Sequence, residues 1–196
     1  MSPIVEGVGL RERGLVEAVG APRVVLELGF GRGELLLDLA EAAPERAFLG
    51  VEISRKRVEK VARRAEKRGL ENVFLLHAPA EFALDRVLPP ACVTECWINC
   101  PDPWPKKRHW RRRLLQAPLV ALLARALEPG ALLHVSTDHP GYRDWIAEVM
   151  AAQTEFANLH ATPWSDSPPA RRETAYEAEW RAEGRAIAYF DYRRGQ

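Results

Sequence analysis

Residues 23–34 read RVVLELGFGRGE, a short apolar run that leads into three closely spaced glycines. The run is rich in valine and leucine, which is typical of a buried strand. Glycines directly after such a strand allow the backbone to adopt positive φ and to approach a ligand closely. The stretch therefore predicts a strand Arg23–Leu28 that leads through a glycine turn into a helix Gly33–Ala43.

The same alternation of apolar runs and amphipathic stretches continues along the chain. Further strands are expected at Arg46–Val51, Asn72–His77, Ala91–Asn99, Ala131–Thr137 and Arg185–Tyr192. Helices are expected at Ser54–Arg68, on both sides of Pro118 and up to Pro129-Gly130, at Tyr142–Ala152 and at Glu173–Glu183. Strands that are separated by helices need crossover connections. The fold class is therefore α/β, with a mainly parallel sheet, helices on both faces and an antiparallel C-terminal strand.

The composition is that of a single globular domain spanning residues 1–196. Hydrophobic residues make up 47% of the chain and charged residues 28%, which provides enough apolar material for a core. No apolar run reaches the roughly 18 residues of a membrane span, and residues 1–20 hold no sustained apolar stretch of a signal peptide. We therefore expect a cytoplasmic protein without a membrane partner.

The three cysteines, Cys92, Cys96 and Cys100, lie in or just after the expected fourth strand. Their spacing of four is compatible with a metal site, but period 2 places all three side chains on one face of a buried strand. A free cysteine packs there as a small hydrophobic residue, and an odd number argues against a disulfide framework. The packing interpretation is favoured, and no metal is expected.

The glycine loop Glu27–Gly33 has the spacing of a nucleotide-binding turn but carries acidic side chains. NAD-binding turns read G-x-G-x-x-G, whereas Glu34 stands here in place of the third glycine. A pyrophosphate would also meet the negative charges of Glu27 and Glu34. The pattern E-x-G-x-G-x-G instead resembles the cofactor loop of class I methyltransferases, whose S-adenosylmethionine is cationic. The alternative is a simple glycine turn.

Two further acids follow other strands at the same expected edge of the sheet. Glu52 follows the second strand, where a carboxylate can accept hydrogen bonds from both hydroxyls of a ribose. The alternative for Glu52 is a surface acid in front of a helix, where the helix dipole favours negative charge. Asp102 follows the fourth strand between Pro101 and Pro103, which stiffen the loop and hold this carboxylate in place.

Two basic clusters stand out against the net charge of +1. Residues 55–68 hold eight Lys/Arg against two Glu, and the favoured interpretation is a solvated helix face. Residues 101–113 hold six Lys/Arg interleaved with Trp104, His109 and Trp110. Such a strip suits phosphate groups, and its aromatic rings suit stacking on bases. It predicts an RNA-facing loop at 101–113.

This loop, P-D-P-W-P-K-K-R-H-x-x-R-R, closely resembles the signature of the tRNA (guanine-N7-)-methyltransferase family. Ser136-Thr137-Asp138 resembles the T-D element of that family, and Thr174–Glu177 resembles its T-x-[FY]-E element. These motifs follow the family's order between residues 23 and 192. The resemblance implies a Rossmann-like class I methyltransferase fold. It also implies methyl transfer from S-adenosylmethionine to N7 of the variable-loop guanine in tRNA.

The resemblance further implies the roles of individual residues. Cofactor-binding positions match Glu27, Gly29, Gly31, Glu52 and Asp102, and the proposed catalytic position also matches Asp102. Substrate-binding positions match Lys106, Asp138, Thr174, Ala175, Tyr176 and Glu177. RNA-contacting positions match Arg108, His109, Arg111, Arg112 and Arg113. Residues 162–184 are expected to form a C-terminal insertion that contributes to the substrate site.

Two features depart from the family pattern. The stretch His77–Glu81 lacks the usual Asp or Asn near the adenine, so Glu81 or backbone groups would have to replace it. Residues 1–22 form a shorter segment before the first strand than the arm of many members. Two other functions stay open: a class I methyltransferase acting on another RNA, and a non-catalytic RNA-binding subunit on the same scaffold. The sequence is compatible with a monomer and with a homodimer.

The chemistry of N7 places few demands on the protein. This atom has a lone pair and no proton, so its methylation needs no obligatory base, and His109 is more simply an RNA contact or a capping group. We expect catalysis by alignment of the base, with Asp102 or Asp138 near the developing charge. Trp104 and Tyr176 are candidate stacking surfaces, and core packing is the alternative for each.

Overall fold

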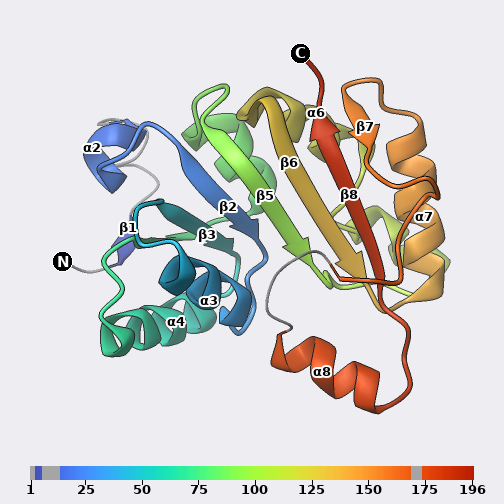
Figure 1. Ribbon diagram of the computed structural model, residues 1–196, viewed down its shortest axis with the longest axis horizontal. Helices are drawn as coiled ribbons and strands as arrows, with labels where there is room; N and C mark the ends of the chain where they lie inside the picture. Colours follow the sequence, from blue (N-terminus) through green and yellow to red (C-terminus); the bar gives the residue numbers. More distant parts are fainter. Residues whose placement is uncertain (1–2, 6–13, 169–173) are drawn as a thin grey trace.

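The computed structural model describes residues 3–5, 14–168 and 174–196 (Figure 1). These residues form one eight-stranded sheet in the order β1-β4-β3-β2-β5-β6-β8-β7. Neighbouring strands from β1 to β6 pair in parallel, whereas β8 pairs antiparallel with both β6 and β7. The mainly parallel sheet with an antiparallel C-terminal strand is therefore confirmed.

The strands are short and mostly buried. Their bounds are Ile4–Val5 (β1), Val24–Leu28 (β2), Phe48–Glu52 (β3), Val73–His77 (β4), Val93–Asn99 (β5), Leu127–Thr137 (β6), Phe156–Asn158 (β7) and Ala188–Arg194 (β8). From β2 the chain builds outward to β3 and β4, and then returns to place β5 on the other side of β2. Ligands of such sheets bind beyond the carboxyl ends of the strands where the order reverses, which is here between β2 and β5.

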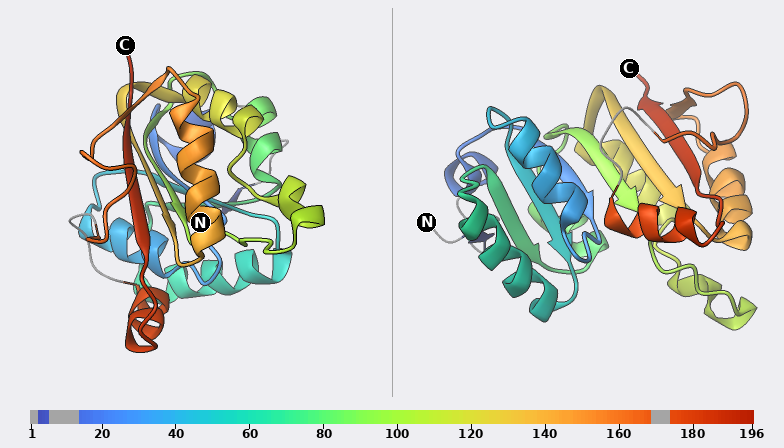
Figure 2. Two further views of the ribbon diagram at one scale, coloured as in Figure 1. Left: turned by 90° about the vertical axis from the view of Figure 1, so that its right-hand side faces the viewer. Right: turned by 60° about the horizontal axis from the view of Figure 1, so that its bottom comes forward.

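Helices cover both faces of the sheet. Their bounds are Leu15–Val19 (α2), Glu34–Ala42 (α3), Arg55–Arg68 (α4), Ala80–Phe82 (α5), Ala117–Ala126 (α6), Pro140–Ala151 (α7) and Ala175–Ala182 (α8). A π-helical turn spans Ala83–Val87 (η1), and a 3-10 helix spans Lys107–Arg112 (η2). Figures 1 and 2 show α3 and α4 on one face and α6 and α7 on the other, with α8 beyond the carboxyl ends of the parallel strands.

The sequence of α4 shows why these helices dock as they do. Its buried residues, Val58, Val61, Ala62 and Ala65, recur at the helical spacing and share a core with α3 and with strands β3 and β4. Its Lys and Arg side chains are exposed except for the half-buried Arg64, as expected for a mostly solvated face. Gly69 ends the helix in the left-handed conformation, with φ of 67°.

The two faces of the sheet have separate cores. The core under α6 and α7 includes Leu123, Leu133, Ile146 and Phe190, all of them almost fully buried. Cys92 and Cys96 pack in this core, which confirms the packing interpretation for these two thiols, and burial raises the pKa of Cys92 to about 11. Cys100 lies just beyond β5, half-buried.

The expected strands and helices form within a few residues of their predicted bounds, with two corrections. The helical piece expected before Pro118 is absent at residues 113–116, and the 3-10 helix η2 lies instead inside the expected loop 101–113. Pro129-Gly130 was expected to end a helix before a strand, but α6 already ends at Ala126 and both residues lie inside β6. The pairing register of β6 with β5 shifts at this point, between Val93 and Glu95. Because a bulge leaves backbone groups outside the ladder, it accommodates a proline that regular pairing would exclude.

Five further short elements were not predicted, namely β1, α2, α5, η1 and β7. None is long enough to show a clear hydrophobic period. Of the expected N-terminal segment 1–22, residues 1–2 and 6–13 lie outside the described part of the chain, as do 169–173 of the expected insertion 162–184. In the described part of the chain, no helix combines the length and apolar character that crossing a membrane requires.

Candidate active site

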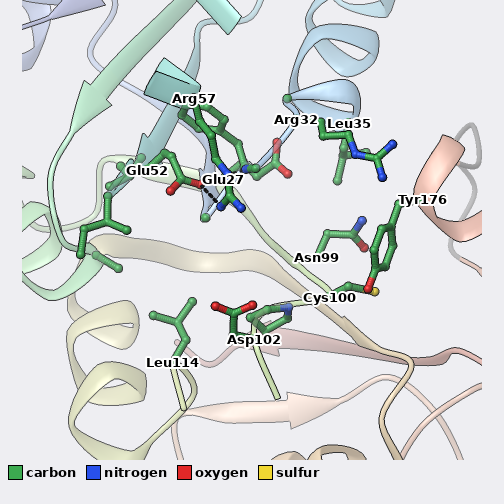
Figure 3. Close-up of a pocket in the computed structure, with 18 of the residues that line it drawn as sticks. Glu27, Arg32, Leu35, Glu52, Arg57, Asn99, Cys100, Asp102, Leu114 and Tyr176 are labelled. Atoms are coloured by element: carbon green, nitrogen blue, oxygen red, sulfur yellow. Dashed lines mark hydrogen bonds and ion pairs between the residues drawn. The ribbon is translucent and has the colours of Figure 1, made fainter. Parts of the chain in front are cut away.

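A cavity of about 640 Å³ opens at the carboxyl ends of the central strands, where the strand order reverses (Figure 3). Its lining includes every residue expected to bind the cofactor: Glu27, Gly29, Gly31, Glu52 and Asp102. Each acid follows or ends a different strand, and the parallel topology brings these strand ends to one edge. The structure thus brings together the whole set of predicted cofactor residues.

The glycine loop needs its glycines for two different reasons. Gly29, Gly31 and Gly33 have φ values of 71°, 53° and 69°, in the left-handed region that side chains strain. At Gly33 a Cβ atom would also lie 2.6 Å from Cγ1 of Val61. The glycines therefore let the loop turn sharply at the cavity and let α3 pack directly against α4.

Glu52 is a buried carboxylate whose position is fixed by backbone amides. Its side chain is 3% exposed, and it accepts hydrogen bonds from the N–H of Ser54 (2.9 Å) and the N–H of Gly31 (3.1 Å). Arg57 lies 3.5 Å from one carboxylate oxygen. Because two carboxylate oxygens offer about four acceptor sites, Glu52 retains the capacity to accept from a pair of ligand hydroxyls.

Glu27 lies deeper, inside β2, and is only 3% exposed. In the sheet it is in register with Gly50 on one side and Trp97 on the other. Glu27 lines the cavity with a buried carboxyl group, whose negative charge matches a cationic ligand group. The cavity wall is therefore acidic at two buried points.

Asp102 stands across the cavity from Glu27 and Glu52 in Figure 3. It lies in the loop after β5 and is exposed. Cys100 and Trp104, on either side of it, both have φ of 44°, an uncommon conformation for residues other than glycine. The loop is thus a sharp, constrained turn that presents the carboxylate to the cavity.

The start of α8 forms the far wall of the cavity and corrects one expectation. Thr174 and Glu177 form a capping box: the Glu177 carboxylate accepts from the Thr174 N–H (2.8 Å), and the Thr174 hydroxyl accepts from the Glu177 N–H (3.2 Å). Glu177 is 0% exposed, so it holds the helix start and is closed to a substrate in this structure. The side chain of Ala175 lies outside the described residues.

Tyr176 separates this cavity from a second one of about 590 Å³, because it lines both. Burial raises the pKa of Tyr176 to about 12, and the charge of Asp138 adds to the effect. Figure 3 shows the phenol beside Asn99 and Cys100. The ring therefore forms a neutral, aromatic partition between the two cavities.

The second cavity contains Asp138, the predicted substrate-site acid that follows β6. The Asp138 side chain is 13% exposed and lies 3.5 Å from Nη1 of Arg185. The Arg185 guanidinium also lies over the ring of Trp180, 3.5 Å from its centroid. This cavity thus combines a carboxylate acceptor with aromatic surfaces, which suits a planar base with N–H donors.

The basic strip after β5 reaches the first cavity at Arg112. Lys106, Arg108, Arg111 and Arg112 are exposed. Lys106, expected at the substrate, lines neither cavity and faces solvent. Exposed cations at the mouth of a cavity are suited to phosphate groups of a large anion.

The aromatic residues of this strip are less open than expected. Trp104 is half-buried, with the edge of His109 at 5.8 Å between ring centroids and the Arg112 guanidinium 5.0 Å above its ring. Its exposed stacking face is therefore already partly covered by side chains of the same loop.

Arg113 is a second correction. It was expected among the RNA-contacting residues, but it is 3% exposed and packs among Trp110, Tyr142 and Trp145. Desolvation lowers the pKa of this guanidinium below its ordinary value. A buried side chain cannot reach a phosphate, so the RNA-facing part of the strip ends at Arg112.

Sequence reasoning also missed residues that line the first cavity. Asn99 ends β5 and Cys100 follows it, Ile53 follows β3, and Arg57 lies in the first turn of α4. For Asn99, Cys100 and Ile53 the signal was present, since they lie at the carboxyl end of a strand, as Glu52 and Asp102 do. Leu114 offered no such signal, because its place on the cavity wall depends on how the segment after η2 folds back.

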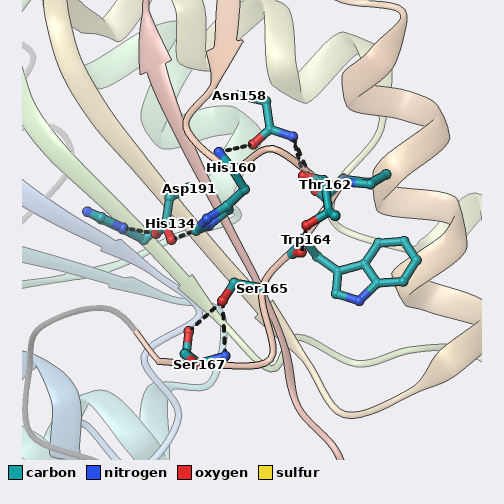
Figure 4. A network of polar contacts seen from close by, with 9 residues as sticks. His134, Asn158, His160, Thr162, Trp164, Ser165, Ser167 and Asp191 are labelled. Atoms are coloured by element: carbon teal, nitrogen blue, oxygen red, sulfur yellow. Dashed lines mark hydrogen bonds and ion pairs between the residues drawn. The ribbon is translucent and has the colours of Figure 1, made fainter.

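A polar cluster lies apart from both cavities (Figure 4). Asp191 on β8 bonds Nδ1 of His134 (2.5 Å) and Nε2 of His160 (2.7 Å). Burial by itself raises the pKa of Asp191, but the hydrogen bonds and charges of the two histidines outweigh it and lower the pKa. The cluster ties the segment after β7 to the sheet. Among the residues with described positions, no group of three or more His, Cys, Asp or Glu could hold a metal ion.

Comparison with known proteins agrees with this site. Residues 21–190 match the family model described as "Putative methyltransferase". A tRNA (guanine-N(7)-)-methyltransferase of Halorhodospira halophila is 37% identical over 193 residues, which cover 95% of this chain and 83% of that protein. The chain belongs to the tRNA (guanine-N7-)-methyltransferase family. A member from Leifsonia xyli is 41% identical over 175 residues, or 88% of this chain and 76% of the relative.

Solved structures support the fold class of this family member. The 16S rRNA methyltransferase KamB aligns with a TM-score of 0.65 at 19% identity, covering 89% of this chain and 88% of KamB. TrmN from Thermus thermophilus aligns with a TM-score of 0.63 at 18% identity, covering 96% of this chain and 48% of TrmN. The Rossmann-like methyltransferase fold is therefore confirmed.

The family departure after β4 can now be placed. Ala78, Pro79, Ala80 and Glu81 all line the first cavity, between the end of β4 and α5. The backbone groups and the carboxylate of Glu81 thus stand where the family's usual Asp or Asn is absent. Their contact with an adenine stays a prediction.

Proposed function

We propose that this chain transfers a methyl group from S-adenosylmethionine to N7 of the variable-loop guanine in tRNA. One observation carries the proposal: three acids near strand ends meet in one cavity, beside a second cavity with its own carboxylate, and a strip of exposed cations reaches the first cavity at Arg112. Relatives that share most of this chain's length bear the name tRNA (guanine-N(7)-)-methyltransferase.

The first cavity fits S-adenosylmethionine. Glu52 would accept the ribose hydroxyls, and the buried Glu27 would face the cationic part of the cofactor. Ala78 to Glu81 and the exposed side chain of Ile53 would border the adenine. When bound, the cofactor supplies a methyl group on a cationic sulfur, which a neutral nitrogen lone pair can accept. The buried carboxylates Glu27 and Glu52 disfavour a dinucleotide pyrophosphate on electrostatic grounds.

The second cavity fits the guanine. Asp138 is a carboxylate that can accept hydrogen bonds from the N1–H and the exocyclic amine of guanine. Adenine presents a different set of hydrogen-bonding groups at this edge. Tyr176, shared by the two cavities, would hold the ring at their junction, where N7 can face the first cavity. Removing a base from a folded RNA costs a few kcal/mol, which stacking on such aromatic surfaces offsets.

Catalysis then consists of alignment and charge stabilisation. The N7 lone pair needs no base, and transfer of the methyl group leaves positive charge on the purine ring. Asp102, exposed to the cavity from a constrained turn, is the carboxylate placed to stabilise that charge. The exposed side chains of Lys106, Arg108 and Arg111 would bind tRNA phosphates along the basic strip.

The test is methyl transfer from labelled cofactor to unmodified tRNA transcripts. One transcript carries guanine at the variable-loop position, and its partner carries adenine there. The expected result is label on the first transcript alone, recovered as 7-methylguanosine. Label on both transcripts, or on another RNA in preference to tRNA, would favour a methyltransferase with a different substrate. Cofactor binding without any label would favour a non-catalytic RNA-binding subunit.

A further inference from the structure

Arg113 is a buried cation inside an aromatic cage. Its guanidinium carbon lies 4.6 Å from the ring centroid of Trp110, 5.0 Å from that of Tyr142 and 5.2 Å from that of Trp145. The side chain is 3% exposed. A buried charge is costly unless its surroundings compensate it. Aromatic rings compensate a guanidinium only when it lies over their faces. The cage therefore fixes both the position and the orientation of the guanidinium.

The cage is itself anchored to the core. The Tyr142 hydroxyl accepts a hydrogen bond from the N–H of Leu115 (3.0 Å), and the Trp145 indole N–H donates to the carbonyl of Leu115 (2.9 Å). Tyr142 and Trp145 belong to α7, and Tyr142 is fully buried. Arg113 is thus held by Trp110 of its own segment and by two residues of α7, a helix that packs on the sheet.

From this anchored position Arg113 reaches into the loop that carries Asp102. Its Nε–H donates to the carbonyl oxygen of Pro103 at 2.9 Å. Pro101, Pro103 and Pro105 have no N–H, so at these positions the carbonyl oxygen is the only backbone group that another part of the protein can bond. The hydrogen bond falls on the residue directly after Asp102.

The loop needs such an anchor because its backbone is strained. Cys100 and Trp104 both have φ of 44°. Non-glycine residues persist in this region only where the surroundings hold them there. Nη1 of Arg113 has no hydrogen-bond partner in the described structure, so the Nε bond and the ring contacts define its geometry. A lysine retains the charge but lacks both the planar group and the Nε–H.

We propose that Arg113 is a positioning residue that fixes the Pro103 backbone and thereby the Asp102 carboxylate at the first cavity. The inference rests on the proposed methyl transfer, in which Asp102 stabilises charge on the base. Without the Arg113 bond the loop relaxes at Cys100 or Trp104, and Asp102 leaves its position. Glu27 and Glu52 are held by other elements and keep theirs.

The test compares Arg113→Lys with Arg125→Lys. Arg125 is a matched control because it also donates to backbone carbonyls, those of Leu84 and Leu88, at a distance from both cavities. For each variant, kcat, KM for tRNA, Kd for S-adenosylmethionine and Tm are measured. Arg113→Lys is expected to lower kcat by at least about 30-fold while Kd changes less than about threefold. Arg125→Lys is expected to lower Tm and leave kcat unchanged.

A third variant separates positioning from RNA binding. Arg111→Ala removes an exposed cation of the same strip and is expected to raise KM for tRNA while kcat is retained. If Arg113→Lys is too unstable to purify, Trp145→Phe weakens the cage through loss of its bond to Leu115 and is expected to lower kcat in the same direction.

Two results would overturn the positioning role. One is a kcat within about threefold of wild type in Arg113→Lys, or in Trp145→Phe if that variant is used. The other is a loss of kcat matched by an equal loss of cofactor affinity, which would show that the substitution disturbs the whole site. If the unaltered protein itself transfers no methyl group to tRNA, the proposed function fails instead, and cofactor binding still reports an intact first cavity.

Discussion

The two cavities that meet at Tyr176 are built in different ways. In the first, Glu27 and Glu52 are buried, and backbone amides hold Glu52 in place. In the second, Asp138 is paired with the half-exposed Arg185, whose other partner, Glu183, lies on the surface. Buried groups with backbone partners keep their geometry, whereas exposed ion pairs contribute little and exchange readily with water or ligands.

We therefore expect the two cavities to bind their ligands in different ways. The first cavity is preformed, and we expect it to bind its small ligand without RNA. The helix α8 borders both cavities, the first at Tyr176 and the second at Tyr176 and Trp180, and it meets the glycine loop through an exposed ion pair between Arg32 and Glu179 at 3.3 Å. An incoming base can replace the Arg185 contact to Asp138, so this side is expected to gain its final geometry from tRNA.

The largest effect is expected at the junction of the cavities. Asp102→Ala removes the carboxylate that stabilises charge on the base, and loss of one such group costs roughly 100- to 1,000-fold in kcat. Because Asp102 is exposed, Tm is expected to stay near that of wild type. Near-normal turnover in a rapid-quench assay would show that the carboxylate has no part in the reaction.

A second substitution tests whether the first cavity stands alone. Glu52→Gln keeps the size of the side chain but weakens charge-assisted hydrogen bonds to the ribose, which are worth about 1.5–3 kcal/mol each. The cofactor Kd is expected to rise roughly 10- to 100-fold in calorimetry, while tRNA affinity at fixed salt is retained. Equal losses of both affinities would mean that the two cavities are not independent.

Glu177 distinguishes a capping role from a substrate contact. A capping box works with Gln as well as Glu, so Glu177→Gln is expected to keep kcat/KM for tRNA within about threefold. Glu177→Ala removes the cap, at a cost of about 1 kcal/mol in the free energy of unfolding, and is expected to raise KM for tRNA several-fold. If Gln proved as harmful as Ala, the negative charge itself would be needed at the substrate.

The smallest effect concerns the segment behind the second cavity. The histidines hold the pKa of Asp191 below its ordinary value of 3.8, so its ionised form stabilises the folded state. This stabilisation is present above about pH 4 and is lost as the pH falls through the lowered pKa. Asp191→Asn is expected to lower the unfolding free energy at pH 7, and the difference from wild type should shrink below pH 3.8. Urea unfolding at both pH values measures it, and a constant difference would contradict the assignment.

The parts that sequence reasoning predicted follow from local rules. Glu52 and Asp102 were predicted because parallel strands end at one edge of the sheet. The glycine loop was predicted because glycines directly after a strand allow a turn with positive φ. The expectation for Arg113 failed because it depends on a tertiary contact. Arg113 is adjacent to exposed arginines in sequence, but its burial depends on α7, about thirty residues further along the chain. Local sequence cannot show such a contact.

Glu177 has a structural role that the family resemblance did not indicate. The pattern T-x-x-E is itself the signature of a capping box, so its structural role was readable from the sequence. Family resemblance favoured a substrate contact instead. The second cavity, in contrast, could not have been predicted, because it requires knowing that α8 lies beyond the carboxyl ends of the strands, beside the loop after β6.

The most direct test of the proposed reaction replaces one atom of the substrate. A tRNA with 7-deazaguanine at the variable-loop position keeps the N1–H and amine edge that Asp138 would recognise, but it has a carbon in place of N7. It is expected to bind with the affinity of the guanine-containing tRNA and to receive no methyl group. Methyl transfer to the 7-deaza tRNA at the normal rate would show that N7 is not the acceptor and would contradict the proposed function.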